Sequence, residues 1–373
     1  MPTSRAPIAV LFGTRPEAIK LAPVVLALRD ANLPHVVVTT GQHASMVTEV
    51  LDLFGIRPDD DLALLQPGQS LDHLLARAVE RVGSMLDERQ PAAVVVQGDT
   101  TSMLGSALAS FHRGIPVAHV EAGLRSNDLR HPFPEEMNRR VASTLARWHF
   151  APTESAAANL RREGITEGVA VVGNTIVDAV RVIGREKDQL SPRFAAFIGD
   201  APYLLATAHR RESWDGGIAA IATALRDVLH ARAELRLVFA THPNPIARGP
   251  VDAILGTEPR ALVVDALPYP EFLALLAHAL LVVSDSGGVQ EEGPTLGVPI
   301  LVTRSTTERP EGIDAGAVQL IGTDADVVRT ATLELLDDSE RLATMSRAGH
   351  GIYGDGWAAR RIVAVLKREA FGE

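Results

Sequence analysis

Four carboxylates stand at or near the ends of apolar runs in the first half of the chain. Asp99 follows the run AAVVVQ, and Glu121 follows VAHV. Glu135 and Glu136 come after a proline-rich loop, at the start of a helical pattern. If the two runs are neighbouring parallel strands, their carboxyl ends meet at one edge of a sheet. Crowded carboxylates raise one another's pKa values, which suits general acid–base catalysis near neutral pH.

Each of these carboxylates also has a structural interpretation. Asp99 is placed to cap the helix that follows it, and Glu135 and Glu136 stand where acidic side chains favour a helix dipole. Glu121 is harder to explain in this way, because a carboxylate directly after a buried strand is costly unless it is paired. Their convergence on one edge favours an acid–base site for the set.

Basic side chains follow two other apolar runs. The first run of the chain ends in GTRPEAIK, where a helix N-terminus, Arg15 and Lys20 together favour a bound phosphate. The same segment is also compatible with a simple strand–helix turn that carries solvated basic residues. A later run ends in TAHRRE, which places His209 and Arg210 at a strand end, with a structural histidine as the alternative for His209.

A glycine pair follows the run ALLVV in the second half of the chain. Adjacent glycines let backbone N–H groups approach a phosphate, and an acidic residue one turn later is placed to bind ribose hydroxyls. Glycine pairs are common in turns, so this motif gains weight only from the others. The predicted nucleotide ligands in this segment are Ser286, Gly287, Gly288 and Glu292.

Short runs rich in Val, Ile and Leu alternate along the chain with segments whose apolar residues recur every three or four positions. Continuous apolar strands separated by helices indicate parallel sheets that helices cover on both faces, an α/β fold. The predicted strands are 8–12, 35–39, 92–97, 116–120, 203–207, 235–240, 261–264, 279–283 and 299–302. The predicted helices include 70–88, 217–230 and 325–337.

The alternation weakens between residues 184 and 201, a charged segment with two prolines that we interpret as a connection between domains. We therefore expect two Rossmann-like domains that face each other across a cleft, residues 1–183 and 184–355. The amphipathic segment 356–373 is expected to pack back onto the first domain. In domains of this kind ligands bind at the carboxyl ends of the strands.

Composition excludes several classes of protein. The 373 residues carry a net charge of −10, which argues against a general nucleic-acid or anionic-membrane binder. There is no cysteine, so thiolate metal sites and a cysteine nucleophile are excluded, and no histidine pair has the spacing of a metal site. The first apolar run is too short for a secretion signal, and no run approaches a membrane span, so a cytoplasmic location is expected.

The order of the motifs resembles one enzyme family, the non-hydrolysing UDP-N-acetylglucosamine (UDP-GlcNAc) 2-epimerases. The matching segments, spread across nearly the whole chain, are GTRPEAIKLAP, TGQH, QGDT, HVEAGLRS, PFPEEMNR, VVGNTIVD, HRRES, SDSGGVQEE and TERPE. The resemblance implies a GT-B-like architecture and homodimers. It also implies a reaction without a cofactor or metal, in keeping with the missing dinucleotide-binding fingerprint.

The resemblance further implies how the reaction proceeds. UDP leaves C1 as the C2 proton is removed, which gives 2-acetamidoglucal; UDP then adds back as C2 is reprotonated on the opposite face, which gives UDP-N-acetylmannosamine (UDP-ManNAc). By motif match, Asp99, Glu121 and Glu135 are the acid–base carboxylates. His209 and Arg15 are expected to stabilise the departing diphosphate, with Lys20 near it. In the glycine segment, Ser286, Gly287 and Gly288 are expected on the phosphates and Glu292 on the ribose.

Many members of the family bind UDP-GlcNAc at a second, regulatory site. The residues of this chain that resemble that site are Gln42, His43, Glu136, Arg210 and His242. Two positions differ, because Ser45 stands where such members commonly have a glutamine and Gly68 where they have an arginine. The lost guanidinium should weaken binding of a phosphate severely, so we expect little or no need for an activator.

Three alternatives stay open at this level. A GT-B glycosyltransferase shares the fold and the nucleotide site but needs fewer clustered acids. A hydrolysing relative would release UDP and free N-acetylmannosamine. A regulator without catalytic activity would bind the nucleotide sugar and leave it unchanged.

Overall fold

The computed structural model describes residues 6–41, 44–66, 68–184, 190–208, 216–241 and 244–373. His209, Arg210, Gln42, His43 and His242 lie outside the described residues, as does the side chain of Ser45. The chain divides into two compact units. The first contains residues 1–179 and 353–373, and the second contains residues 180–352.

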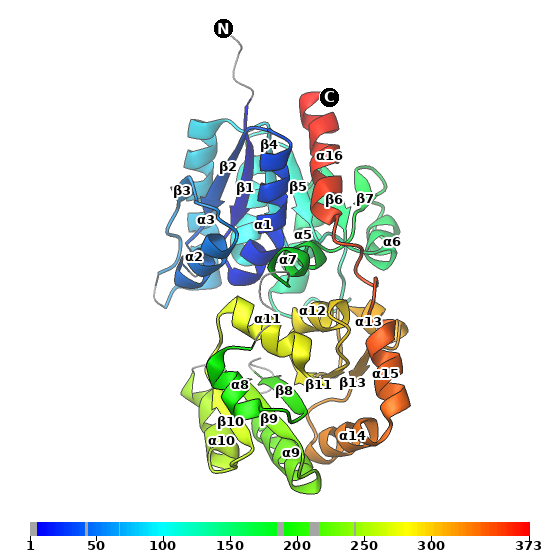
Figure 1. Cartoon of the computed structure of the whole chain (residues 1–373). Coiled ribbons are helices and arrows are strands. Elements are labelled where there is room, and N and C mark those ends of the chain that lie inside the picture. Colours follow the sequence, from blue (N-terminus) through cyan, green and yellow to red (C-terminus); the bar gives the residue numbers. More distant parts are fainter. Residues whose placement is uncertain (1–5, 42–43, 67, 185–189, 209–215, 242–243) are drawn as a thin grey trace. The chain divides into compact units, whose positions relative to one another are not determined.

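The first unit is built on a seven-stranded parallel sheet flanked by helices (Figure 1). The strand order is β3-β2-β1-β4-β5-β6-β7. The strands are β1 (Ile8–Phe12), β2 (His35–Thr39), β3 (Asp60–Asp61), β4 (Ala93–Gln97), β5 (Val117–Val120), β6 (Trp148–Ala151) and β7 (Val169–Val171). The helices are α1 (Arg15–Asp30), α2 (Ala44–Leu53), α3 (Leu71–Arg89), α4 (Thr101–Phe111), α5 (Glu135–Leu145), α6 (Glu154–Arg162) and α16 (Ala358–Phe371), and α7 (Thr175–Gly184) contains the boundary of the units.

The second unit contains a six-stranded parallel sheet in the order β10-β9-β8-β11-β12-β13. Its strands are β8 (Tyr203–Ala208), β9 (Arg236–Thr241), β10 (Ala261–Val264), β11 (Leu281–Ser284), β12 (Ile300–Val302) and β13 (Val318–Leu320). Its helices are α8 (Pro192–Ile198), α9 (Gly217–Ala231), α10 (Pro245–Leu255), α11 (Tyr269–His278), α12 (Val289–Thr295), α13 (Pro310–Asp314), α14 (Ala325–Asp337) and α15 (Ser339–Ala348). Two parallel sheets with flanking helices confirm the predicted α/β fold.

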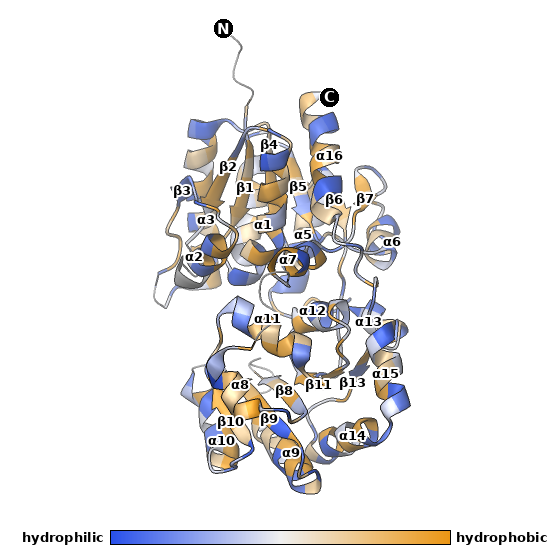
Figure 2. Ribbon diagram, viewed as in Figure 1, coloured by the Kyte–Doolittle hydropathy of each residue, from blue (hydrophilic) through white to orange (hydrophobic). Residues whose placement is uncertain are grey.

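The cores explain why the apolar runs form central strands. Every residue of β1, β4, β8 and β11 is buried, so these strands have no exposed face. Helices on both sides bury them, as a parallel sheet requires. The helices are amphipathic instead, and Figure 2 shows hydrophobic and hydrophilic residues together on α14 and α16. Among the described residues, no helix is both long and apolar enough to span a membrane.

The C-terminal helix belongs to the first unit because specific contacts hold its start there. The Asp178 carboxylate of α7 accepts hydrogen bonds from the backbone N–H groups of Ala358 and Ala359, at 3.2 and 3.0 Å. It thereby satisfies N–H groups that the first turn of α16 leaves without a helical partner. The backbone N–H of Asn174 donates to the Tyr353 carbonyl at 2.7 Å. Helix α16 also contacts α1, beside which it lies in Figure 1.

Two histidines face each other across neighbouring strands inside the first unit. His119 of β5 is paired in register with His149 of β6, and both side chains are buried. Burial lowers the pKa of each imidazole to about 4, since no water is present to hydrate a charged ring. The Nε2 atom of His119 hydrogen-bonds the Gly98 carbonyl at 2.7 Å, so this nitrogen carries the proton of the neutral ring.

We expect these histidines to make folding stability depend on pH. The folded pKa values near 4 lie below the unfolded value of roughly 6.5. As pH falls from 7 to 5 the unfolded chain therefore takes up protons that the folded chain does not, and stability is lost. The free energy of unfolding should fall by roughly 1–2 kcal/mol for each histidine over this range. Denaturant titrations at both pH values measure it.

The variant His149→Gln should lose less stability between pH 7 and pH 5 than the wild-type chain does. His73→Gln, which changes an exposed histidine, should match the wild type and serves as the control. Equal losses in the wild type and His149→Gln would show that the buried ring does not cause the pH dependence.

Candidate functional site

The strand order of the first sheet brings the predicted residues to one edge. β4 pairs in parallel with β1 on one side and with β5 on the other, so the carboxyl ends of the three strands are neighbours. Arg15 follows β1 as the first residue of α1, Asp99 follows β4, and Glu121 directly follows β5. Glu135 is the first residue of α5 and is partly exposed. The crossover topology thus collects segments that are far apart in sequence.

Glu121 forms an ion pair with Lys20 of α1. The two side chains are 6% and 5% exposed, so each charge relies on the other in place of water. Glu121 also has a left-handed backbone, with φ of 66°. A non-glycine residue held in that region is under local strain that the surrounding structure must maintain. Lys20, expected near a phosphate, therefore contacts the predicted acid–base carboxylate directly.

Asp99 is held through both its side chain and its backbone. Arg139 of α5 donates to the Asp99 carboxylate at 2.5 Å, and the Asn138 side chain donates to the Asp99 carbonyl at 2.8 Å. The His119 bond described above holds the carbonyl of the preceding residue, Gly98. Thr100, rather than Asp99, caps α4 by accepting a hydrogen bond from the Met103 N–H at 3.0 Å. The Asp99 carboxylate is thus not used as a helix cap.

Glu17 connects the turn after β1 with the turn after β4. Its Oε2 atom accepts hydrogen bonds from the N–H groups of Gly13 and Thr14, both at 2.8 Å. Its Oε1 atom accepts one from the Thr100 hydroxyl at 2.6 Å. Burial raises the pKa of this carboxyl group, and the accepted hydrogen bonds oppose that shift. Glu17 therefore links the Arg15 and Asp99 turns.

Glu136, expected at the regulatory site, is fully buried. Its carboxylate accepts from the backbone N–H groups of Ser126 and Asn127, at 2.9 and 3.3 Å. It also pairs with Arg139 at 3.2 Å and with Arg140 at 3.0 Å. Through Arg139, Glu136 supports the Asp99 carboxylate, and through the two N–H groups it holds the loop before α5.

In the second unit, the glycine pair follows β11 as predicted from its position in the sequence. The hydroxyl oxygens of Ser284 and Thr207 lie 2.6 Å apart, and the Ser286 N–H donates to the Ser284 hydroxyl at 3.0 Å. The Arg309 guanidinium lies behind Gly287, where an added Cβ would come within 3.0 Å of Nη1. A side chain at position 287 would require this arginine, which is held by ion pairs, to shift by a few tenths of an ångström.

A buried set of four charged side chains supports that turn. Arg309 pairs with Glu291 at 2.6 Å and also pairs with Glu308, which Arg304 contacts at 3.1 Å. All four residues are at most 9% exposed. Alternating charges of this kind offset the cost of leaving water only when each meets a partner. The sequence motifs include residues of this set, but the residue types alone do not show which charges are paired.

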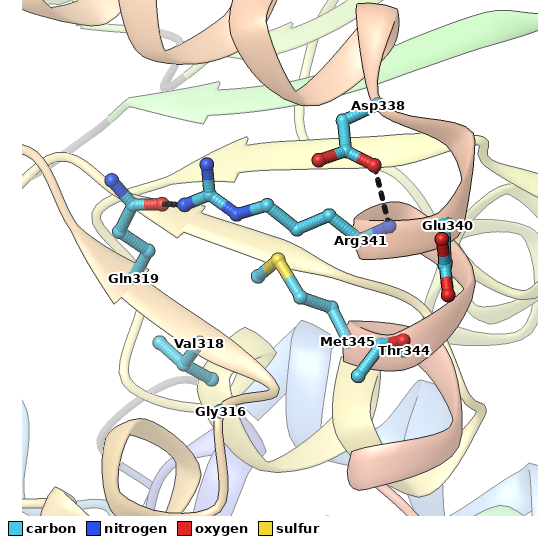
Figure 3. A pocket seen from close by; sticks show the side chains of 8 residues that line it. All are labelled: Gly316, Val318, Gln319, Asp338, Glu340, Arg341, Thr344 and Met345. Carbon is cyan, nitrogen blue, oxygen red and sulfur yellow. Dashed lines mark hydrogen bonds between the residues drawn. The ribbon is translucent and has the colours of Figure 1, made fainter.

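One groove of about 600 Å³ lies elsewhere in the second unit, between β13 and α15 (Figure 3). Figure 3 shows Arg341 extending across it to Gln319, whose side-chain oxygen accepts a hydrogen bond at 2.8 Å. None of the predicted site residues lines it. Within the described part of the chain, no group of three or more His, Cys, Asp or Glu side chains is arranged to hold a metal ion.

Comparison with known proteins identifies the family. The family model described as UDP-N-acetylglucosamine 2-epimerase matches residues 27–367. A UDP-N-acetylglucosamine 2-epimerase of Escherichia coli O157:H7 is 45% identical over 369 residues, which cover 96% of this chain and 98% of the relative.

Two solved structures have the same fold over nearly their whole length. A putative UDP-N-acetylglucosamine 2-epimerase from Listeria monocytogenes has a TM-score of 0.94 and 41% identity, with 98% of this chain and 97% of that chain covered. The Neisseria meningitidis UDP-GlcNAc 2-epimerase bound to UDP-GlcNAc has a TM-score of 0.91 and 37% identity, with 96% and 99% covered. The chain belongs to the UDP-N-acetylglucosamine 2-epimerase family.

Proposed function

We propose that this chain interconverts UDP-GlcNAc and UDP-ManNAc by inverting the configuration at C2. The observation that carries the proposal is the pair of charge-matched carboxylates, Asp99 with Arg139 and Glu121 with Lys20, at one edge of the first sheet. Inversion at a carbon that bears hydrogen needs a group to take the proton on one face and a group to return it on the other. Membership of the family supports the choice of substrate.

The reaction is an elimination followed by an addition. The C1–O bond breaks and its electrons leave with UDP, while the C2 proton passes to an enzyme carboxylate and a C1–C2 double bond forms. The product of this step is 2-acetamidoglucal. UDP then adds back to C1 as a second carboxylate protonates C2 on the opposite face. Because electrons and protons balance within the substrate and these carboxylates, the proposal requires no cofactor.

Residue roles follow from this scheme. Asp99, Glu121 and Glu135 are the proposed acid–base carboxylates, with His209 as a further catalytic group. Because the reaction is reversible, a group that removes the proton in one direction returns it in the other. The C2 proton is only weakly acidic, so stabilising the departing diphosphate should lower much of the barrier.

The proposed diphosphate ligands are Arg15 and His209, with Ser286, Gly287 and Gly288 from the glycine turn and Glu292 on the ribose. Arg15 supports this role because it is partly exposed at the N-terminus of α1, where helix N–H groups also favour an anion. Lys20 acts in the proposal through Glu121, whose charge it balances. We further propose a cytoplasmic homodimer, which rests on the family resemblance.

We also propose that the enzyme needs little or no activator. Gly68 is exposed and has a φ of 70°, so this position offers neither a guanidinium nor a backbone that an arginine readily adopts. The Glu136 carboxylate is engaged by two backbone N–H groups and two arginines, which supports a structural role. Both features weaken the case for a second nucleotide-sugar site.

The central test is exchange at C2. In D₂O with UDP-GlcNAc and no added cofactor or metal, UDP-ManNAc should appear and deuterium should enter C2 of the sugar, as followed by proton NMR. Release of UDP without deuterium at C2 would contradict the proposal. Free N-acetylmannosamine together with UDP would indicate the hydrolysing enzyme, and transfer only after an acceptor is added would indicate a glycosyltransferase.

The ion pair of Glu121 and Lys20 gives a second test. Glu121→Gln should lower kcat by roughly 10²–10⁴-fold, because a proton acceptor or donor is removed. It should also destabilise the fold, by up to about 3–5 kcal/mol, because the buried Lys20 loses the negative charge of Glu121. Steady-state kinetics and denaturant unfolding measure the two effects.

The double variant Lys20→Met/Glu121→Gln separates catalysis from stability. It removes both charges of the pair together and should recover part of the lost stability while kcat stays low. Lys20→Arg keeps the cation and serves as the matched control. If the double variant regained activity along with stability, Glu121 would have no chemical role.

Activator dependence is tested from the product side. UDP-ManNAc alone, freed of UDP-GlcNAc, should be converted at once with a linear progress curve, because no second site has to be filled. Reaction is followed by NMR or by separation of the two sugars. A lag that traces of UDP-GlcNAc abolish would contradict the absence of an activator requirement and leave the epimerase proposal intact.

A further inference from the structure

A tyrosine outside the predicted site contacts one of its proposed ligands. The Tyr269 hydroxyl donates a hydrogen bond to Oε1 of Glu292 at 2.9 Å. The two residues come from different helices of the second unit, α11 and α12 (Figure 1). Tyr269 is 4% exposed and Glu292 is 6% exposed, so little water is available to replace this bond. A charge-assisted hydrogen bond in such surroundings is stronger than one on the surface.

Tyr269 is well placed to hold the carboxylate still. It is the first residue of α11 and stands between Pro268 and Pro270, whose rings restrict the backbone on both sides. Because the Tyr269 ring is buried, its hydroxyl can occupy only a few positions. An ionised carboxylate can only accept hydrogen bonds, so the phenol must be the donor. The contact therefore restrains the position of Oε1 and narrows the orientations open to the Glu292 carboxylate.

That carboxylate lies directly over the glycine turn. A Cβ built on Gly288 would be 3.7 Å from Oε1 and 4.0 Å from Oε2 of Glu292, which is ordinary contact distance. The carboxylate is thus next to the backbone that is proposed to bind the diphosphate. A nucleoside diphosphate held by that turn would bring its ribose into the neighbourhood of Glu292.

We propose that Tyr269 is a positioning residue for ribose recognition. By orienting the Glu292 carboxylate, it lets that group accept hydrogen bonds from the vicinal 2′ and 3′ hydroxyls, and so it sets the preference for a ribonucleotide over a deoxyribonucleotide. The inference rests on the proposed function, which assigns the ribose to Glu292. Tyr269 itself need not touch the nucleotide.

The physical reason is orientation. Two hydroxyls on adjacent carbons have a fixed position relative to each other. A carboxylate can accept hydrogen bonds from both only in a limited range of orientations. Without the phenol, Glu292 would lose that restraint, and more of its ordering would have to occur when the nucleotide binds, at a cost in affinity. This cost applies only to ligands that use the hydroxyls. A nucleotide that lacks them should bind equally well with or without Tyr269.

The test compares UDP with 2′,3′-dideoxy-UDP by isothermal titration calorimetry. The wild-type chain should prefer UDP by about tenfold or more. Tyr269→Phe should raise the Kd of UDP by about five- to tenfold and change the Kd of the dideoxy nucleotide by less than about twofold. The measured quantity is the ratio of the two Kd values, which a general loss of stability does not alter.

Tyr203→Phe is a matched control in the same unit. Tyr203 is also buried, and its hydroxyl donates to the Leu275 carbonyl of α11 at 2.6 Å. This variant loses a buried tyrosine hydrogen bond to the same helix but no contact with Glu292. It should lower the melting temperature and keep the wild-type ratio of Kd values.

Glu292→Gln distinguishes failure of the positioning role of Tyr269 from failure of the ribose assignment of Glu292 on which that role depends. If Glu292→Gln loses the preference for UDP and Tyr269→Phe keeps it, Glu292 binds the ribose and the positioning role of Tyr269 is overturned. If Glu292→Gln also keeps the preference, the ribose assignment itself is wrong and the inference falls with it. A ratio lowered equally in Tyr203→Phe and Tyr269→Phe would overturn the specific role of Tyr269.

Discussion

Ionised side chains that leave water must meet a counter-charge or several hydrogen-bond donors, and at the carboxyl edge of the first sheet this requirement shapes the structure. Lys20 of α1 reaches Glu121 after β5, and Arg139 of α5 reaches Asp99 after β4. Each pair joins a helix to a strand end that is remote in sequence. Displacing α1 would separate Lys20 from the buried Glu121 carboxylate, and separating two buried charges costs several kcal/mol. Charge pairing therefore limits how the helices can lie on the sheet.

Glu17 extends the same principle to neutral donors. Two backbone N–H groups and the Thr100 hydroxyl converge on its carboxylate, so the turns after β1 and β4 share one acceptor. The second unit uses the alternating charges of Arg304, Glu308, Arg309 and Glu291 beneath its glycine turn. In both units the groups proposed to contact the substrate are thus supported by charges that the substrate need not touch. Such support keeps the contacting groups in place without requiring them to pack in a core.

Local pattern predicted the fold because the central strands are apolar throughout. All nine predicted runs are strands, from β1 to β12. The strands that the pattern did not reveal, such as β6, β7 and β13, are short, and β6 begins with Trp148 and His149, which do not form an aliphatic run. Helix α8 falls within the segment expected to be only a connection, because two prolines and several charges obscured the apolar spacing of its seven residues.

The sequence suggested members of the candidate site but not their pairing. Strand ends and glycine turns are visible in sequence, so Asp99, Glu121 and the turn at Gly287 could be proposed from it. Arg139 and Tyr269 lie on helices and Arg309 directly precedes one, each far in sequence from the group it supports, and an arginine or tyrosine there has many ordinary uses. The only signal was that charged residues recur in the same motifs as the predicted ligands, as in PFPEEMNR and TERPE. The density of motifs indicates which segments of the chain form the site. The interatomic distances in the structure are needed to show which residues are in contact.

Buried ion pairs are a poor means of stabilising a fold, because apolar residues of the same volume often do so equally well. The first sheet nevertheless carries the buried Lys20–Glu121 pair and the partly buried Arg139–Asp99 pair at the edge where its strands end, while β1 and β4 contain no charged residue. Stability alone does not explain that distribution, since the apolar strand centres already supply the core. The proposed reaction offers a reason, because an elimination that moves a proton and releases a diphosphate would require charged groups to be in place before the substrate arrives. The strained backbone at Glu121 points the same way, since strain of that kind persists where position matters more than local stability.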